Sequence, residues 1–271
     1  MSTLDTLKRA VKAVSGRPRP RILSVDRATH LTPNLIRVTF RGPELDGLPD
    51  GCDGGHCKLL LPEPDESRDA FVARIEAGGK PARRTYTVRH YRSADAELDI
   101  DFVDHGDGGP ASRWARHAKP GSFLGFMGPG APKLTDFNAD WYLVAADLSA
   151  LPMASAALEA MPRDAKGIAV FEVPSPEDRQ TLDAPQGVAV HWLVHADART
   201  ASTQQEALLR GLDWPKGRVQ TCIAGESGAI KGLRHLLKTE RAIPRGDLYL
   251  SGYWKVGMVE DQHQTFKRTE D

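Results

Sequence analysis

The sequence has few cysteines, no excess of charge of either sign and no long apolar run. Cys52, Cys57 and Cys222 are too few and too scattered for a disulfide framework, which favours a reducing cytoplasm. Lys+Arg and Asp+Glu both number 36, so charge gives no reason to expect nucleic acid or a membrane as partner, and any anion site must be local. No apolar stretch approaches the ~20 residues of a membrane span, and residues 1–20 lack the apolar centre of a signal peptide.

The same cysteines do not predict a metal site. Cys52 and Cys57 flank His56, which invites a comparison with zinc-binding sequences. A structural zinc site usually takes four ligands, often as two closely spaced pairs, and no second pair follows. We therefore predict no metal site and interpret these side chains as structural.

The first part of the chain is patterned as short strands. A length of 271 residues with 40% hydrophobic residues suits two globular domains. Apolar alternation and turn residues predict strands at 21–27, 35–41, 56–61, 82–89, 97–103 and 123–127, with one helix at 110–117. This pattern favours a six-stranded antiparallel β-barrel over residues 17–136. Residues 2–14 carry apolar positions at helical spacing and predict an N-terminal helix within 1–16.

The second part alternates strands with helices. Strands are predicted at 141–146, 168–173, 188–194, 218–224 and 247–251, and helices at 153–161, 204–212 and 226–240. Such alternation predicts a doubly wound α/β domain with a parallel sheet over residues 137–271. The tail from Val259 is interpreted as a helix that crosses back to the barrel or as a frayed end.

One strand of the predicted barrel combines cationic, aromatic and hydroxyl side chains. In the run Arg83–Arg89, Arg84 and Tyr86 share one face of the strand and Thr87 lies on the other. A flavin nucleotide needs a cation near its phosphate, an aromatic surface, and a hydroxyl or amide near its reactive ring nitrogen. An edge strand with solvated arginines is the alternative for this run alone.

A glycine-rich turn follows one strand later, within His105–Trp114. Gly106, Gly108 and Gly109 let backbone amides converge, and Pro110 suits the first helical position. The first turn of a helix favours a phosphate because its N–H groups lack intrahelical partners. The two segments together predict a flavin site.

Four segments resemble one known family. Arg84–Arg89, His105-Gly106-x-x-Gly109-Pro110-Ala111-Ser112-x-Trp114, Ser251-Gly252-Tyr253-Trp254-Lys255-x-Gly257 and His56–Pro62 are similar to the siderophore-interacting proteins, which belong to the ferredoxin-reductase-like enzymes. The Gly252-Tyr253-Trp254 element is the most discriminating, since generic flavin reductases lack it. The resemblance covers roughly residues 17–265. It implies an FAD-binding barrel, an NAD(P)H-binding α/β domain, and reduction of ferric siderophores in the cytoplasm with release of Fe(II).

The resemblance also implies roles for individual residues. Arg84 would meet the flavin phosphate, Tyr86 and Thr87 would flank the isoalloxazine, and Gly109–Ser112 would hold the pyrophosphate. His105 and Trp114 would frame the nucleotide, or would be a packed histidine and a core tryptophan. The residues assigned to FAD are Arg84, Tyr86, Thr87, Val88, Arg89, Asp101, Val103, His105, Gly109, Pro110, Ala111, Ser112 and Trp114.

The electron donor would bind to the second domain. Family members usually carry Gly-Asp-Glu-Thr-Ala in the first strand-to-helix turn, and here Ala146 and Leu148 replace the glycine and the glutamate. The residues assigned to the nicotinamide are Asp147, Ala150, Gly225, Glu226, Tyr253 and Trp254. Ordinary packing turns are the alternative. No acidic ribose clamp separates NADH from NADPH, and ferredoxin is an alternative donor.

Three lysines match the positions where family members place cations around the flavin edge. Lys58, Lys133 and Lys255 would bind the anionic oxygen ligands of a ferric siderophore, and solvated surface lysines are the alternative. No catalytic acid or base is expected because the cofactor carries the chemistry. We expect a monomer. Two other functions stay open: a general or ferredoxin-linked flavin reductase, and a siderophore-binding protein without enzymatic activity.

Overall fold

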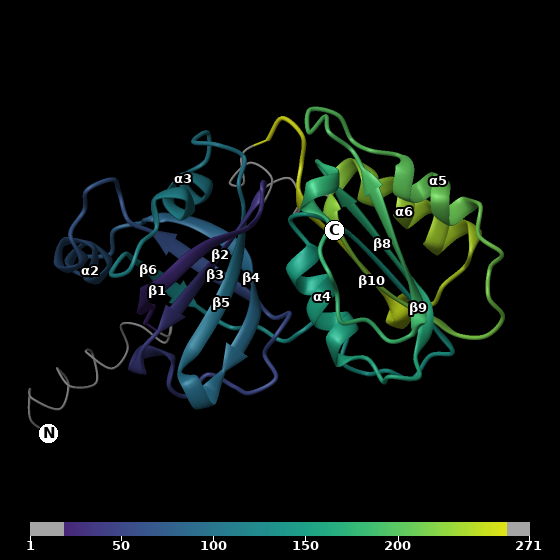
Figure 1. Ribbon diagram of the computed structural model, residues 1–271, viewed down its shortest axis with the longest axis horizontal. Helices are drawn as coiled ribbons and strands as arrows, with labels where there is room; N and C mark the ends of the chain where they lie inside the picture. The colour runs from purple at the N-terminus through teal and green to yellow at the C-terminus, as the bar shows by residue number, and fades with distance from the viewer. Residues whose placement is uncertain (1–18, 259–271) are drawn as a thin grey trace, which may run out of the picture.

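The structure consists of two domains that lie side by side (Figure 1). It is a computed structural model and describes residues 19–258. One domain is a closed barrel and the other contains a five-stranded sheet. The helix predicted within residues 1–16 and the tail from Val259 lie outside the described residues.

The barrel confirms the prediction of six antiparallel strands. Its strands are β1 (Arg21–Thr32), β2 (Leu35–Arg41), β3 (His56–Leu61), β4 (Ala82–Arg92), β5 (Glu97–Val103) and β6 (Phe123–Met127), in the order β1-β2-β5-β4-β3-β6. β1 and β4 continue past their predicted ends. Phe40, Leu59, Val88 and Ile100 point inward and are fully buried, as the alternation of apolar residues requires.

The barrel carries two α-helices, so the prediction of a single helix is wrong. α3 (Pro110–His117) has the predicted bounds, but α2 (Arg68–Glu76) was not expected. Only Phe71 of α2 is buried, and it packs against Phe123 with ring centroids 5.6 Å apart. A helix that buries a single apolar side chain has no apolar stripe, and therefore leaves no helical periodicity in the sequence. Short 3₁₀ turns follow β2 (η1, Pro43–Leu45) and β4 (η2, Ser93–Asp95).

The second domain confirms the doubly wound prediction. Its elements are β7 (Trp141–Asp147), α4 (Leu151–Ala160), β8 (Lys166–Val173), η3 (Pro176–Asp178), β9 (Gly187–Val194), α5 (Gln204–Arg210), β10 (Val219–Glu226), α6 (Ser227–His235), η5 (Arg245–Asp247) and β11 (Leu248–Trp254). The strands are parallel in the order β11-β10-β7-β8-β9. The helix predicted to residue 240 is α-helical to His235 and then continues as a π-helical turn, Leu236–Glu240.

β7 is buried on both faces, which explains its continuous apolar sequence. Val144 and Ala146 pack in the core that includes α4, while Leu143 and Ala145 pack in the core that includes α5 and α6. α4 lies on the side of the sheet that faces the barrel (Figure 1). No helix within residues 19–258 is long and apolar enough to cross a membrane.

The two domains are tied together at two places. Asp178 of η3 is fully buried and accepts hydrogen bonds from Thr32 Oγ1 at 2.7 Å and from the backbone and side-chain nitrogens of Asn34 at 3.0 and 2.7 Å. Arg89 of β4 donates to both carboxylate oxygens of Glu159 in α4, at 2.8 and 2.5 Å. These bonds position the barrel against the second domain.

The acidic residues of β5 are buried although they lie opposite the apolar face of that strand. Arg92 donates to Glu97 at 2.9 Å and to Asp99 at 2.8 Å, and Arg27 donates to Glu97 at 3.1 Å. Hydrogen bonds from Arg27 and Arg92 lower the pKa of Glu97 to about 2. Folding therefore favours the charged form of Glu97.

We expect Glu97 to make the stability of the barrel sensitive to acid. A carboxyl group whose pKa is lowered in the folded state stabilises it above the unfolded pKa and loses that effect as pH falls through the folded pKa. For Glu97 this window runs from 4.5 down to about 2. Glu97→Gln should lower the melting temperature at pH 7 by roughly 2–4 °C, and should flatten the pH dependence of unfolding within the window.

The control is Glu76→Gln, at an exposed position at the end of α2. It should behave as the unsubstituted protein when melting is followed by circular dichroism. Equal pH dependence of Glu97→Gln and the unsubstituted protein would contradict the assignment.

Candidate functional site

The predicted flavin strand is β4, which pairs with β3. Tyr86 lies opposite Cys57 and Thr87 opposite His56. Thr87 is buried, and the Tyr86 ring lies 4.5 Å from the Phe102 ring at the edge of the barrel core. The partly exposed Arg84 donates to the carbonyl of Arg83 at 2.9 Å. A cation, an aromatic ring and a hydroxyl thus lie within four residues of one strand.

Four other residues assigned to FAD have partners inside the protein. Val88 is buried in the barrel core, and Val103 packs against the core of the second domain. Arg89 is paired with Glu159. Asp101 accepts from Arg37 Nε and Nη2 at 2.7 and 2.8 Å. Their assignment to FAD stays a prediction.

The glycine turn leaves the N-terminus of α3 without a side-chain cap. Gly109 is the N-cap residue and makes no side-chain bond to the helix, and Gly106 has φ +81°. The Ser112 hydroxyl donates to the Gly106 carbonyl at 2.8 Å and accepts from the His105 N–H at 3.1 Å. The Ser112 side chain therefore shapes the turn, and the backbone N–H groups of Ala111 and Ser112 are what the turn offers to a phosphate.

His105 and Trp114 have different surroundings. A methyl group on Gly109 would lie 2.8 Å from His105 Cε1, so the absence of a side chain at Gly109 admits the imidazole. Trp114 is partly buried and packs on Phe40 and Phe102, with ring centroids 6.2 and 5.6 Å apart. This packing favours the alternative that Trp114 belongs to the barrel core.

The first strand-to-helix turn of the second domain is organised by Asp147. Its Oδ1 accepts from the backbone N–H groups of Ser149 and Ala150 at 2.9 and 3.2 Å. Its Oδ2 accepts from the indole N–H of Trp254 at 2.7 Å, and a methyl group on Gly225 would lie 2.9 Å from this oxygen. Burial raises the pKa of Asp147. Asp147 therefore joins the ends of β7 and β11.

Glu226 has the corresponding role at the start of α6. Its Oε2 accepts from the N–H groups of Gly228 and Ala229 at 2.6 and 3.0 Å, and its Oε1 accepts from Val256 N–H at 3.2 Å. Glu226 thus caps α6, whereas Asp147 organises the turn before α4, whose N-terminus has no side-chain cap. At α6 the protein's own carboxylate takes the place where a dinucleotide phosphate would find free N–H groups.

The residues assigned to the nicotinamide do lie together. Asp147, Gly225, Glu226 and Trp254 stand at the carboxyl ends of β7, β10 and β11, where open parallel sheets bind ligands. Tyr253 lies beside them, at the end of β11. The structure therefore brings these residues together at one edge of the sheet.

Two of the three predicted substrate lysines lie around His56. The Lys58 ammonium donates to Thr85 Oγ1. Lys133 Nζ lies 3.3 Å from His56 Nδ1. Burial, Lys133 and Lys58 together lower the pKa of His56. Lys255 stands directly after the last residue of β11.

Sequence reasoning missed two members of this region, His56 and Tyr249. Lys133 Nζ lies 5.9 Å from the centre of the Tyr249 ring, and the Tyr249 hydroxyl lies 3.4 Å from that of Tyr253. Period-two spacing was the available signal, because His56 and Lys58 share one strand face and so do Tyr249 and Tyr253.

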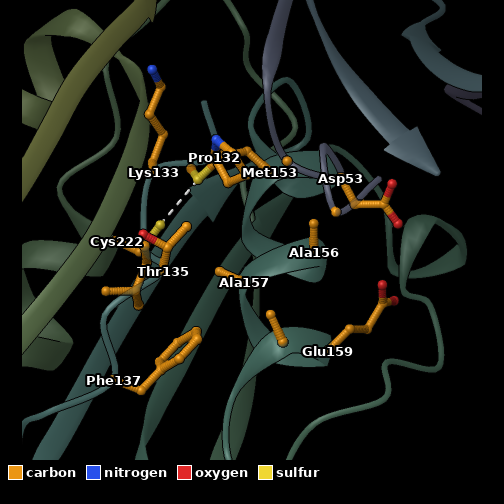
Figure 2. A pocket seen from close by; sticks show the side chains of 14 residues that line it. Asp53, Pro132, Lys133, Thr135, Phe137, Met153, Ala156, Ala157, Glu159 and Cys222 are labelled. Carbon is orange, nitrogen blue, oxygen red and sulfur yellow. Dashed lines mark hydrogen bonds between the residues drawn. The ribbon is translucent and has the colours of Figure 1, made fainter. Parts of the chain in front are cut away.

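A cavity of about 350 Å³ lies at the domain junction but does not include the flavin strand (Figure 2). It is lined by residues before β3, by the linker from Pro132 to Phe137, and by α4. Lys133 and Phe137 both come from this linker, and the Lys133 side chain extends away from Phe137 (Figure 2). Arg84, Tyr86 and Thr87, which are predicted to bind the flavin, do not line this cavity.

The three cysteines are free and buried. Cys222 Sγ lies 3.0 Å from Met153 Sδ in the wall of the cavity. Burial raises the pKa of Cys52 to about 11 and that of Cys222 to about 12. Among the residues from 19 to 258, no three or more His, Cys, Asp or Glu side chains gather as metal ligands.

Known proteins match this chain over nearly its whole length. The family model of the siderophore-interacting FAD-binding domain matches residues 24–133, and that of the siderophore-interacting protein matches residues 139–257. The ferric vibriobactin reductase ViuB of Vibrio cholerae is 38% identical over 253 residues, which cover 90% of this chain and 92% of ViuB. An NADPH-dependent ferric-chelate reductase of Escherichia coli is 28% identical, with 87% and 93% covered.

Solved structures agree with these matches. The siderophore-interacting protein SipS of Aeromonas hydrophila superposes with a TM-score of 0.78 at 33% identity, over 93% of this chain and 99% of SipS. The two family models divide the chain at the boundary between the barrel and the parallel sheet. The chain therefore belongs to the siderophore-interacting protein family, and its barrel is the FAD-binding domain of that family.

Proposed function

We propose that the protein is a cytoplasmic, FAD-dependent reductase of ferric siderophores that takes electrons from NAD(P)H. The observation that carries this proposal is the placement of Lys58 and Lys133 at the domain junction, beside the strand that bears Arg84, Tyr86 and Thr87. The names of the Vibrio cholerae and Escherichia coli relatives support the same reaction class.

The barrel residues fit FAD. The uncapped N-terminus of α3 offers N–H groups to the pyrophosphate, and Arg84 offers a cation to a phosphate oxygen. Tyr86 provides an aromatic surface and Thr87 a hydroxyl beside the isoalloxazine. Bound FAD accepts a hydride and releases electrons one at a time.

The three lysines supply a positive electrostatic field that attracts the anionic substrate. A ferric siderophore carries anionic oxygen ligands and is bulky, so it needs an open, positively charged site. Lysine is a flexible point charge, which suits chelates of varied shape better than a bidentate guanidinium does. Once iron is reduced, its hard oxygen ligands hold Fe(II) more weakly and the ion departs. No acid or base of the protein is needed for this step.

The edge of the parallel sheet at the carboxyl ends of β7, β10 and β11 is the proposed binding site of the electron donor. It recognises the nicotinamide of NAD(P)H more than its phosphates. Asp147, Ala150, Gly225, Glu226, Tyr253 and Trp254 lie along this edge, and the capping carboxylate of Glu226 disfavours a phosphate at α6. A ferredoxin is the alternative donor.

Replacing Arg84 should weaken FAD binding. Arg84→Ala removes a charge-assisted contact to phosphate and should raise the dissociation constant of FAD roughly ten- to hundredfold. Arg83→Ala is the matched control, since Arg83 is exposed on the opposite face of β4. Fluorescence titration of the flavin-free protein measures both. Unchanged FAD affinity of Arg84→Ala would remove Arg84 from the site.

Replacing the three lysines should impair reduction of anionic substrates only. We expect the change of Lys58, Lys133 and Lys255 to Ala to lower kcat/KM for an Fe(III) tris-catecholate complex by about tenfold or more, with a smaller effect at high salt. Reduction of menadione, an uncharged acceptor, should be unaffected. Steady-state kinetics at two ionic strengths tests this prediction. Undiminished turnover of the ferric complex would contradict the assignment of the three lysines to substrate binding.

The donor can be identified from flavin bleaching. We expect NADH or NADPH to reduce the bound flavin in a stopped-flow experiment at least about tenfold faster than reduced ferredoxin does, because a hydride donor fits the edge of β7, β10 and β11. Bleaching by ferredoxin alone would overturn the choice of donor while leaving the ferric-siderophore reaction standing.

A further inference from the structure

His56 stands at the start of β3, on the outer face of the barrel. It pairs in register with Thr87, the hydroxyl residue of the flavin strand. Lys58 follows two residues later and therefore shares the strand face of His56, while Cys57 between them points into the barrel core and is fully buried. His56 thus lies on the face that carries the cationic site.

The contact between His56 and Lys133 determines the protonation of the imidazole. His56 Nδ1 lies 3.3 Å from Lys133 Nζ. An ammonium group has three donors and no acceptor, so Nδ1 must be the acceptor and cannot carry a proton. The ring in this arrangement is neutral, with its proton on Nε2. The lowered pKa of His56, caused by burial and by the charges of Lys133 and Lys58, agrees with a neutral ring.

The linker that carries Lys133 is fitted to the same ring. Gly130 N–H donates to the His56 carbonyl at 2.8 Å. A methyl group on Gly130 would collide with the imidazole, so the absence of a side chain at Gly130 lets the ring lie flat against the linker. The backbone bond and the ring contact together hold the linker three residues before Lys133.

Lys133 is held from the other side by the second domain. Its ammonium lies 5.9 Å from the centre of the Tyr249 ring, within the range of a cation–π contact. A lysine has four rotatable bonds and loses considerable entropy when it is fixed in one position. Two neutral partners, the imidazole from β3 and the phenol ring from β11, keep its charge undiminished while they restrict its motion.

We propose that His56 is a positioning residue for substrate recognition: its neutral Nδ1 holds the Lys133 ammonium at the domain junction, where it receives the anionic oxygens of a ferric chelate. This inference rests on the proposed function, in which Lys133 binds the substrate. A carboxylate in place of His56 would hold Lys133 as well but would cancel its charge. A neutral acceptor fixes the cation and leaves its field available to the substrate.

The test compares two substitutions that differ in their ability to accept a hydrogen bond. His56→Phe keeps a flat ring against Gly130 but removes the acceptor, and His56→Asn places a carbonyl oxygen near the position of Nδ1. We expect His56→Phe to raise KM for the Fe(III) tris-catecholate complex roughly three- to tenfold, the loss expected for one hydrogen bond, with kcat and flavin content unchanged. His56→Asn should return KM to within about twofold of the unsubstituted value.

A second, independent signal comes from the ring itself. The ¹⁵N chemical shifts of the His56 imidazole should show an unprotonated Nδ1 and a protonated Nε2 at pH 7, and Lys133→Ala should shift the Nδ1 resonance. His235→Phe is the control, because His235 is an exposed residue near Glu240 at the end of α6. It should leave KM unchanged.

Comparing His56→Phe with Lys133→Ala distinguishes a failure of the proposed function of Lys133 from a failure of the proposed role of His56. If Lys133→Ala leaves KM unchanged, the proposed binding role of the lysine fails. If Lys133→Ala raises KM and His56→Phe does not, only the inference about His56 is overturned. If both raise KM, His56→Phe should have no further effect in the Lys133→Ala background, because residues acting through one contact are not additive. Full additivity, or failure of His56→Asn to rescue KM, would also overturn it.

Discussion

The docking of the barrel against the α/β domain is the constraint on which the site depends. Asp178 is fully buried and accepts hydrogen bonds from Thr32 and Asn34, at the end of β1 and in the turn that follows it. Separating the domains would break these bonds, which are stronger than bonds between neutral groups when the carboxylate is charged. The Arg89–Glu159 pair adds a second tie, to α4. Because Lys133 reaches from the linker to His56 on one domain and Tyr249 on the other, its position requires this docking.

Helix N-termini are used differently in the two domains. In the barrel, the start of α3 has no side-chain cap, and glycine lets the backbone approach a ligand closely. In the second domain, the Glu226 carboxylate already accepts from the first N–H groups of α6. The start of α3 is therefore open to an anion, whereas the start of α6 is not.

Charge in this protein is organised locally, because the total is balanced at 36 residues of each sign. Arg37 of β2 and Arg92 of β4 are matched to the buried carboxylates of Asp101 and Asp99 on β5, which stabilises the barrel and leaves little field outside it. Lys133 instead contacts an imidazole and a phenol ring. Neutral partners fix a cation without cancelling it, so a neutral protein can present a positive site to an anionic chelate.

The amino-acid sequence by itself determined the barrel and the parallel sheet, because both follow from the spacing of neighbouring residues. Periodicity located β2, β3, β5, β6 and α3 at their observed bounds, and the family motifs predict Arg84–Thr87 and Gly109–Ser112 as flavin-binding residues. It missed α2, which buries Phe71 as its one apolar side chain. Only the tertiary structure decided that Asp178 joins the domains, that Asp147 bonds Trp254, that Glu226 caps α6, and that His56 contacts Lys133. Most of these contacts join residues from separate elements, and the capping contact depends on the direction in which one carboxylate points. The spacing of neighbouring residues in the sequence predicts neither.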